Sequence, residues 1–212
     1  MDQVEQFFDS YAHDFNAIYG TSNSLVNRVL NPILRKSMRI RFEKSILYCQ
    51  PTEGKTVLDI GCGPGHYAIA LANCGAKKII GIDFAEEMIR IAEKNTVMAN
   101  VADRCEFIVD DIFKHNFAEK FNFSIIMGVM DYIVDPYKML ETVQLLTKEK
   151  AFFSFPKSGG FLALQRQIRY QSRCPLYLYS ADQIKNLFNK FSPNKHKIES
   201  IKRDYFVTWT LC

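Results

Sequence analysis

The sequence predicts a doubly wound α/β domain, in which helices cover both faces of a mostly parallel sheet that ends in an antiparallel hairpin. Three observations support this fold class. Short apolar runs alternate with helical patterns over residues 55–155. These runs are continuously apolar, as in parallel strands that are buried on both faces. The first run leads directly into three closely spaced glycines, which is typical of a ligand-binding strand end.

The composition is that of one globular domain spanning residues 1–212. Hydrophobic residues make up 48% of the chain and charged residues 24%, which excludes a disordered tail, a collagen-like fibre or a low-complexity array. The net charge of +4 arises from 27 Lys and Arg against 23 Asp and Glu. Such a small excess does not by itself indicate nucleic-acid binding, because basic domains of that kind concentrate charge on one face.

The six cysteines include no Cys-x-x-Cys pair and have no histidine at metal-ligand spacing, so we expect no metal site. The first ten residues are acidic and amphipathic, unlike a signal peptide. No run of about 18 apolar residues is present to span a membrane. We therefore expect a cytoplasmic protein with reduced cysteines, either a monomer or a homodimer.

Residues 1–50 are predicted to be helical. An apolar stripe recurs at three- and four-residue spacing through Val4, Phe7, Phe8, Tyr11 and Phe15. Pro32 is expected to open a second helix. The buried side of that helix is predicted to hold Ile33, Leu34, Met38, Phe42, Ile46 and Leu47. Its other face is interpreted as solvated and carries Arg35, Lys36, Arg39, Arg41 and Lys44.

The central zone alternates strands and helices. Strands are predicted at 56–60, 78–82, 105–109, 123–127 and 151–155. Helices are predicted at 67–73, at about 86–99 and near 136–146. This alternation is typical of βαβ units and hence of a parallel sheet.

The last zone differs in pattern. Residues 156–179 form an expected insertion that mixes aromatic residues with Arg166, Arg169 and Arg173, which suits a cover over a hydrophobic, anionic substrate or else an amphipathic surface helix. Ser180 is predicted to cap a helix that ends near residue 191. Strands at 197–202 and 205–211, joined by a short turn, predict an antiparallel hairpin at the sheet edge.

The segment that carries chemistry is Val57-Leu58-Asp59-Ile60-Gly61-Cys62-Gly63-Pro64-Gly65. Its glycines permit positive φ angles and let a ligand lie against bare backbone. The helix that follows presents unpaired N–H groups at its first turn. In a doubly wound sheet, ligands bind at this edge, where the strand order reverses.

The spacing of this loop discriminates between ligands. A dinucleotide loop requires Gly-x-Gly-x-x-Gly, whereas Gly65 arrives one residue early and is followed by His66. A phosphate-binding P-loop requires Gly-Lys-Ser or Gly-Lys-Thr, which is absent here. Asp59 would repel a pyrophosphate but can bind an ammonium group. The loop therefore favours a cofactor with an amino-acid tail and no phosphate.

The second strand supplies a further candidate residue. Asp83 ends that strand, 22 residues after Gly61, where a carboxylate can accept hydrogen bonds from both ribose hydroxyls. Phe84 and Met88 follow it and are expected to pack beside an adenine ring.

The third and fourth strands complete the expected ligand edge. The third strand ends at Asp110 and Asp111, one of which is expected to accept from the adenine amino group while Ile112 covers the ring. The fourth strand ends at Gly128, where a missing side chain leaves room for the cofactor.

These motifs together resemble the cofactor domain of the class I S-adenosylmethionine-dependent methyltransferases over residues 55–155. The resemblance rests on Asp59-x-Gly61-x-Gly63-x-Gly65 with Asp83 and Asp111. It implies a seven-stranded Rossmann-like sheet, glycines flanking the methionine moiety, Asp83 on the ribose and Asp111 on the adenine. Asp110 stands where many relatives have glycine, so which of Asp110 and Asp111 meets the adenine stays open.

The resemblance also extends to the N-terminus. The stretch from Phe8-Asp9-Ser10-Tyr11 to Tyr19 is similar to the lid helix of small-molecule members, which include ubiquinone/menaquinone and magnesium-protoporphyrin methyltransferases. Tyr11 and Tyr19 are then expected to close over the cofactor carboxylate, or else to pack in the core. The implied reaction is methyl transfer from S-adenosyl-L-methionine to an O or N atom of a small, partly hydrophobic molecule, leaving S-adenosyl-L-homocysteine.

A hydroxyl acceptor needs a general base, and Asp131 and Tyr132 follow the fourth strand at the right edge. Alternatively, Asp131 caps the next turn and Tyr132 packs. Three rival functions remain: an RNA or protein methyltransferase, a cofactor-binding protein without turnover, and, more remotely, a nicotinamide dehydrogenase. No Asn-Pro-Pro-Tyr-like tetrapeptide for a flipped base follows the fourth strand.

Overall fold

The computed structural model describes residues 25–159, 175–192 and 194–211, with side chains described from residue 36 onward. Tyr11, Tyr19, the N-terminal apolar stripe and most of the 156–179 insertion lie outside the described residues. Among the described helices, none has the length and apolar character needed to cross a membrane.

One seven-stranded sheet forms the centre of the molecule, in the order β3-β2-β1-β4-β5-β7-β6. The strands are β1 Thr56–Ile60, β2 Lys78–Asp83, β3 Cys105–Val109, β4 Phe121–Ile126, β5 Thr147–Pro156, β6 His196–Ile201 and β7 Asp204–Thr210. The first five are parallel, while β7 runs antiparallel to both β5 and β6. This arrangement confirms the predicted doubly wound sheet and its C-terminal edge hairpin.

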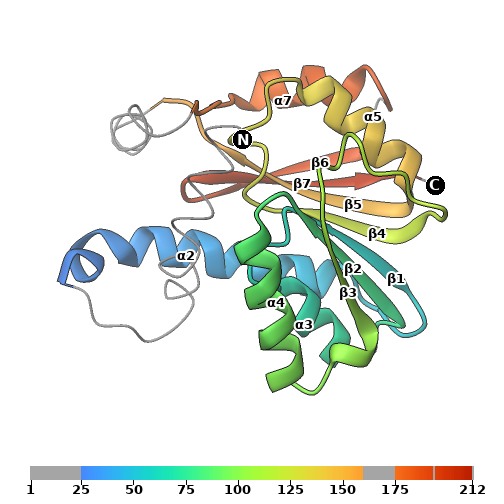
Figure 1. The fold of residues 1–212 in the computed structure, drawn as a ribbon. Coiled ribbons are helices and arrows are strands. Elements are labelled where there is room, and N and C mark those ends of the chain that lie inside the picture. Colours follow the sequence, from blue (N-terminus) through green and yellow to red (C-terminus); the bar gives the residue numbers. More distant parts are fainter. Residues whose placement is uncertain (1–24, 160–174, 193, 212) are drawn as a thin grey trace.

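The helices cover both faces of this sheet (Figure 1). They are α2 Leu25–Tyr48, α3 His66–Asn73, α4 Glu86–Met98, α5 Pro136–Leu146 and α7 Ala181–Asn189, with a short 3-10 turn at Ala102–Arg104. The first three lie on one face, and α5 and α7 lie on the other (Figure 1). The chain leaves β1 toward β2 and β3 and then crosses to β4, so the strand order reverses between β1 and β4. The ligand edge of such a sheet lies at this reversal.

Two apolar layers hold the sheet and its helices together. Phe153 faces the layer beneath α5 and α7, where Phe188 and Trp209 also pack. Its neighbour Phe152 faces the opposite layer, beside Phe206. Successive residues of a strand point to opposite faces, so a continuous run of phenylalanines fills both layers. Burying one such phenylalanine side chain contributes about 1.5–3 kcal/mol to the free energy of folding.

Side chains cap two of the helices, and the cap at Ser180 confirms the prediction from sequence. The Ser180 side chain accepts from the Gln183 backbone N–H, and the Gln183 side chain accepts in return from the Ser180 N–H, which forms a capping box on α7. Asp135 caps α5 by accepting from the backbone N–H groups of Tyr137 and Lys138.

The expectations for α2 were wrong in two respects. The helix begins at Leu25 and runs through Pro32 instead of opening there. A proline inside a helix costs about 3 kcal/mol through one lost hydrogen bond and a steric clash, a cost that packing of the remaining turns can offset. The buried stripe also differs, since Leu47 is 64% exposed whereas Arg41, expected in solvent, is 8% exposed. Hydrophobicity alone did not indicate this stripe because it includes the buried polar residues Ser37, Arg41 and Ser45.

Candidate active site

The glycine loop follows β1 and is tied to the end of β2. Gly61, Gly63 and Gly65 have φ angles of 66°, 49° and 79°, in the region that favours glycine. The Gly61 and Cys62 N–H groups both donate to the Ile82 carbonyl, at 2.8 and 3.2 Å. A Cβ atom at Gly61 would lie 2.4 Å from Val129 Cγ2, in the turn after β4. The loop and that turn therefore meet without room for a side chain at position 61.

The third glycine of the loop serves packing as well as conformation. Gly65 caps α3 in the left-handed region, and a Cβ atom there would lie 3.0 Å from Ala92 Cβ on α4. His66 begins α3, and burial lowers its pKa to about 4, so its ring is neutral at pH 7. The N-terminus of α3 therefore presents backbone N–H groups without an added side-chain charge at this first helical position.

Asp83 joins the glycine loop to the end of β2. Its Oδ2 accepts from the Gly63 N–H at 2.9 Å and its Oδ1 accepts from the Ala85 N–H at 3.0 Å. The residue is buried. Each carboxylate oxygen carries more than one acceptor position, so these bonds leave capacity for a ligand hydroxyl. The residue predicted to bind ribose is thus also the one that fixes the loop.

Asp59 is buried at 1% exposure near the end of β1, two residues before Gly61 of the loop. Its Oδ2 has no hydrogen-bond partner within the part of the chain that the structure describes. Burial, followed by the nearby charge of Asp83, raises the pKa of Asp59 to about 8. A buried carboxyl oxygen without a partner costs about 1–3 kcal/mol or more, and a cationic ligand group would remove that cost.

Cys62 lies in the same electronegative surroundings. Burial raises the pKa of its thiol well above the usual value, and the carboxylates of Asp83 and Asp59 raise it further. A thiol so disfavoured from ionising is a poor nucleophile, consistent with a small residue that fills the loop.

The end of β3 presents two carboxylates. Asp110 Oδ2 lies 2.9 Å from His115 Nδ1, and this hydrogen bond lowers the pKa of Asp110. Asp111 Oδ1 accepts from the Phe113 N–H at 3.0 Å, and its Oδ2 lies 3.6 Å from Lys114 Nζ. Both carboxylates are partly exposed and accessible to a ligand.

The apolar residues expected around an adenine ring differ in accessibility. Phe84 is exposed. Ile112 is 9% exposed and packs in the larger of the two core layers. Met88 is 1% exposed and packs with Ala85 and Ile91. Phe84 is therefore accessible to a ligand, whereas Met88 is packed in the interior in this structure.

The turn after β4 carries the candidate base. Asp131 is buried, and its backbone carbonyl accepts from the Tyr177 N–H at 2.8 Å. The Tyr179 hydroxyl donates to the Met130 carbonyl at 3.3 Å. Burial, then the charge of Asp131, raises the pKa of Tyr179 to about 12. The 175–179 segment thus holds this turn, while α5 is capped by Asp135 and not by Asp131. Tyr132 is half-buried.

Sequence reasoning missed a cation near the end of β4. Arg41 Nη1 donates to Ser154 Oγ at 3.0 Å, and Ser154 Oγ also accepts from the Gly128 N–H at 2.8 Å. A Cβ atom at Gly128 would lie 3.9 Å from the same Arg41 nitrogen. Arg41 stands in a row of basic residues, so only its spacing from Ser37 and Ser45 hinted that it faces inward.

The charge along the ligand edge therefore changes from negative at β3, β2 and β1 to positive at β4. Carboxylates stand at the ends of β3 and β2 and within β1, and a guanidinium stands at the end of β4. An elongated ligand with hydroxyls, an ammonium group and a carboxylate matches this order. S-adenosylmethionine has these groups in this order. Its ammonium group would supply the partner that the Asp59 oxygen lacks among the described residues. Among the described residues no group of His, Cys, Asp and Glu is placed to hold a metal ion.

The comparisons with known proteins agree with this geometry. Residues 51–191 match a family model described as a methyltransferase domain. A ubiquinone biosynthesis O-methyltransferase from Hydrogenovibrio crunogenus is 26% identical over 153 residues, 72% of this chain and 58% of the relative. A release factor glutamine methyltransferase from Buchnera aphidicola is 29% identical, covering 76% of this chain and 60% of the relative. The chain thus spans about 60% of the length of these relatives.

Among solved structures, magnesium protoporphyrin IX methyltransferase from Synechocystis PCC 6803 with bound SAH aligns over 100% of both chains. The TM-score is 0.81 at 19% sequence identity, which shows a shared fold. The family match covers well over half of the chain and includes the glycine loop and the ends of β2, β3 and β4. The protein belongs to the class I S-adenosylmethionine-dependent methyltransferases.

Proposed function

We propose that the protein transfers a methyl group from S-adenosyl-L-methionine to an O or N atom of a small, partly hydrophobic molecule. The observation that carries the proposal is the buried Asp59 carboxyl oxygen, which lacks a partner among the described residues two positions before the glycine loop. An ammonium group would satisfy it, and a pyrophosphate would not.

The cofactor assignments follow the strand order. Asp83 would accept from the ribose hydroxyls, and Asp111 from the adenine amino group beside Phe84. Asp59 would bind the ammonium group, and Arg41 would meet the carboxylate. When bound, this cofactor supplies a methyl group on a cationic sulfur. The chain's own residues orient the reactants and exclude water, which are the main contributions that such a displacement needs.

Asp131 is the proposed general base for a hydroxyl acceptor, with Tyr132 beside it. A base in this position would accept the acceptor proton, an effect worth about 10²–10⁴ in rate. The ubiquinone biosynthesis O-methyltransferase named above supports an oxygen acceptor on a small molecule.

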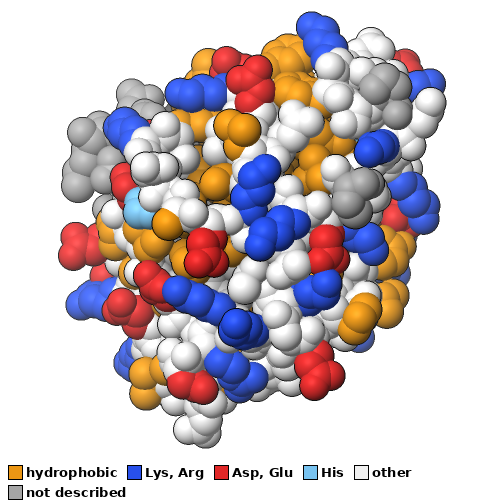
Figure 2. Space-filling model, turned by 90° about the vertical axis from the view of Figure 1, so that its right-hand side faces the viewer, with side chains coloured by type: hydrophobic (Ala, Val, Ile, Leu, Met, Phe, Trp, Pro, Cys, Tyr) orange, Lys and Arg blue, Asp and Glu red, His pale blue; other side chains and the backbone are white. Residues whose placement is uncertain are grey.

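A protein or RNA acceptor is the alternative, supported by the relative that is named for a release factor. On the face shown in Figure 2, Lys and Arg side chains are interspersed with Asp and Glu side chains. This mixture offers a polyanion no uniformly basic surface on that face, which favours the small-molecule proposal.

Cofactor binding is tested by calorimetry and thermal unfolding with S-adenosylhomocysteine and with NAD. S-adenosylhomocysteine should raise the unfolding temperature, because it binds only the native state. Asp83→Asn should weaken its binding about 10- to 150-fold, equivalent to roughly 1.5–3 kcal/mol. The exposed Asp103→Asn is the matched control and should bind normally. A thermal shift with NAD alone would disprove the proposal.

The acceptor class is tested with methyl-labelled S-adenosylmethionine. The probes are a catechol, magnesium protoporphyrin IX, total RNA and total protein. We expect label in a small molecule, and Asp131→Asn should abolish transfer to a hydroxyl while S-adenosylhomocysteine still binds. Label only in RNA or protein would replace this proposal with its alternative.

A further inference from the structure

A chain of buried polar contacts connects the C-terminal hairpin to the end of β4. Ser37 Oγ on α2 donates to Asp204 Oδ2 at 2.7 Å, and Arg41 Nη1 lies 3.7 Å from the same oxygen. Arg41 Nη1 continues to Ser154 Oγ on β5, which accepts from the Gly128 N–H. The connection therefore runs from β7 through α2 and β5 to the backbone at the candidate site.

The antiparallel direction of β7 places Asp204 at the ligand edge. Asp204 is the first residue of β7 and pairs with Pro156, the last residue of β5. It is 4% exposed, so its charge is largely removed from water. A buried carboxylate requires charged or hydrogen-bonded partners, which Ser37 and Arg41 supply here.

The distances indicate that Asp204 orients Arg41 by charge attraction and does not form a short hydrogen bond with it. The hydrogen bond of Arg41 Nη1 goes to Ser154, at 3.0 Å, whereas its separation from the Asp204 carboxylate is that of a looser ion pair. The same nitrogen faces the space that the missing side chain of Gly128 leaves, at 3.9 Å from an added Cβ atom. Without Asp204, the guanidinium would lose this nearby negative charge.

We propose that Asp204 is a positioning residue that holds the Arg41 guanidinium at the end of β4 for the carboxylate of the bound cofactor. The inference rests on the proposed function, because that carboxylate belongs to the amino-acid tail of S-adenosylmethionine. Asp204 itself does not touch the cofactor. It also lies outside residues 51–191, the segment that matches the family model, as does Arg41.

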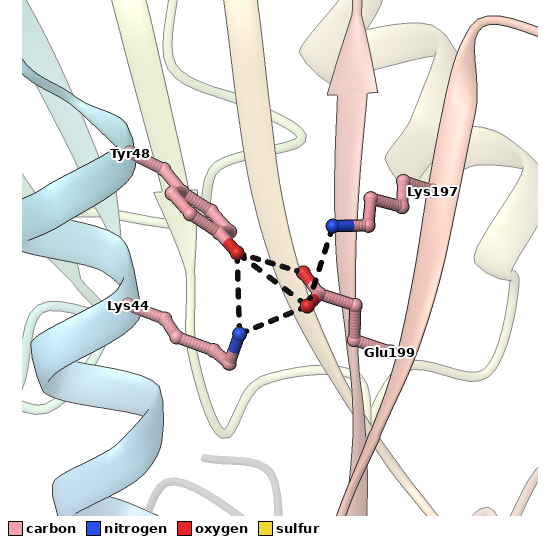
Figure 3. A network of polar contacts seen from close by, with 4 residues as sticks. All are labelled: Lys44, Tyr48, Lys197 and Glu199. Carbon is pink, nitrogen blue, oxygen red and sulfur yellow. Dashed lines mark hydrogen bonds and ion pairs between the residues drawn. The ribbon is translucent and has the colours of Figure 1, made fainter.

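A second network at the same interface supplies a matched control (Figure 3). Lys44 and Tyr48 of α2 both contact Glu199 of β6, with Lys44 Nζ 2.9 Å from Glu199 Oε1, and Lys197 also pairs with it. These contacts join the same helix to the same hairpin one turn beyond Arg41. Glu199 therefore anchors α2 as Asp204 does, but through Lys44 and Tyr48 and not through Arg41.

The test compares two ligands on three proteins by isothermal titration calorimetry. S-adenosylhomocysteine carries the carboxylate, and 5′-methylthioadenosine shares the adenosine and sulfur but lacks the amino-acid tail. In Asp204→Asn we expect S-adenosylhomocysteine to bind at least tenfold more weakly and methylthioadenosine to stay within twofold of the wild type. In Glu199→Gln, both affinities should match the wild type.

Equal weakening of both ligands in Asp204→Asn would mean a merely structural role and would overturn the proposal, as would an unchanged affinity for S-adenosylhomocysteine. If Asp204→Asn does not fold, Ser37→Ala removes only the hydroxyl on Asp204 Oδ2 and should weaken S-adenosylhomocysteine selectively, by a smaller factor; no selectivity there would overturn the proposal. If the wild type fails to bind S-adenosylhomocysteine, the proposed function itself falls, and this inference falls with it.

Discussion

The two halves of the ligand edge obtain their charged groups in different ways. On the β1–β3 half, the contact between Asp83 and the Gly63 N–H joins residues 20 positions apart. On the β4–β7 half, Arg41 meets Ser154 across 113 positions and Ser37 meets Asp204 across 167. The first half is a local motif repeated at successive strand ends, whereas the second is assembled only when α2 and the hairpin dock on the sheet.

This difference gives the halves different sensitivities. A change in the local half acts on the loop that forms the ligand contact. A change in the assembled half acts through the packing that delivers a distant side chain. Substitutions in the loop, at the buried carboxyl and in the turn after β4 should separate these two sensitivities.

The largest effect is expected at Gly61, where the two halves touch. Gly61→Ala adds a Cβ atom 2.4 Å from Val129 Cγ2 at a residue with positive φ. Left-handed strain of about 1–2 kcal/mol and overpacking of about 1–3 kcal/mol should together lower the unfolding free energy by roughly 2–5 kcal/mol. Urea denaturation measures this change.

Gly54→Ala is the matched control for Gly61→Ala. Gly54 also has positive φ, but an added Cβ atom meets nothing within 4 Å. The unfolding free energy of Gly54→Ala should fall only by the cost of the left-handed backbone, about 1–2 kcal/mol. Equal losses in the two variants would show that the contact with Val129 does not matter.

An intermediate effect is expected from the ionisation of Asp59. Its pKa of about 8 in the folded, ligand-free protein lies above the value of about 4 in an unfolded chain. Between these pH values the folded protein holds a proton that the unfolded chain has released. Asp59 therefore lowers the unfolding free energy as pH rises through this window, by up to about 1.4 kcal/mol per pH unit.

Asp59→Asn should remove this contribution. Denaturation at pH 5, 6.5 and 8 should show that the variant gains stability relative to the wild type as pH rises. Calorimetry at pH 6.5 in buffers of different ionisation enthalpy should also show proton release when S-adenosylhomocysteine binds the wild type, and none in the variant. Parallel pH profiles would contradict a raised pKa at Asp59.

The smallest effect is expected at Tyr179, on the assembled half. Tyr179→Phe removes the hydroxyl that donates to the Met130 carbonyl and keeps the ring packed on Phe155. The expected loss is about 0.5–1.5 kcal/mol in the unfolding free energy. Tyr177→Phe is the control, because Tyr177 holds Asp131 through its backbone N–H and should be nearly neutral. A larger loss in the control would mean that side-chain contacts of Tyr177 hold the turn instead.

The site residues of the local half could be predicted from sequence for a physical reason. Parallel strands bring their carboxyl ends to one edge, so Asp83, Asp110, Asp111 and Gly128 fell at that edge once the strands were recognised. The glycines were also predicted to permit positive φ angles, which Gly61, Gly63 and Gly65 adopt.

The site residues of the assembled half could not be predicted in the same way. Arg41 looked like part of a solvated basic face, because a hydrophobic pattern cannot identify a buried stripe built from serines and an arginine. Pro32 gave a misleading start for α2, because the helix begins at Leu25 and runs through the proline. Contacts across more than a hundred residues leave no periodic signal in one sequence.

The reversed direction of β7 has a consequence for which segments can be added at the ligand edge of this fold. In a parallel sheet, only loops that leave strands reach the ligand edge, but an antiparallel strand presents its beginning there. The β6–β7 turn at residues 202–203 therefore hangs over the same rim as the loops after β4 and β5. Insertions in that turn would add residues at this edge without altering strand register, because the turn lies outside the paired residues of β6 and β7.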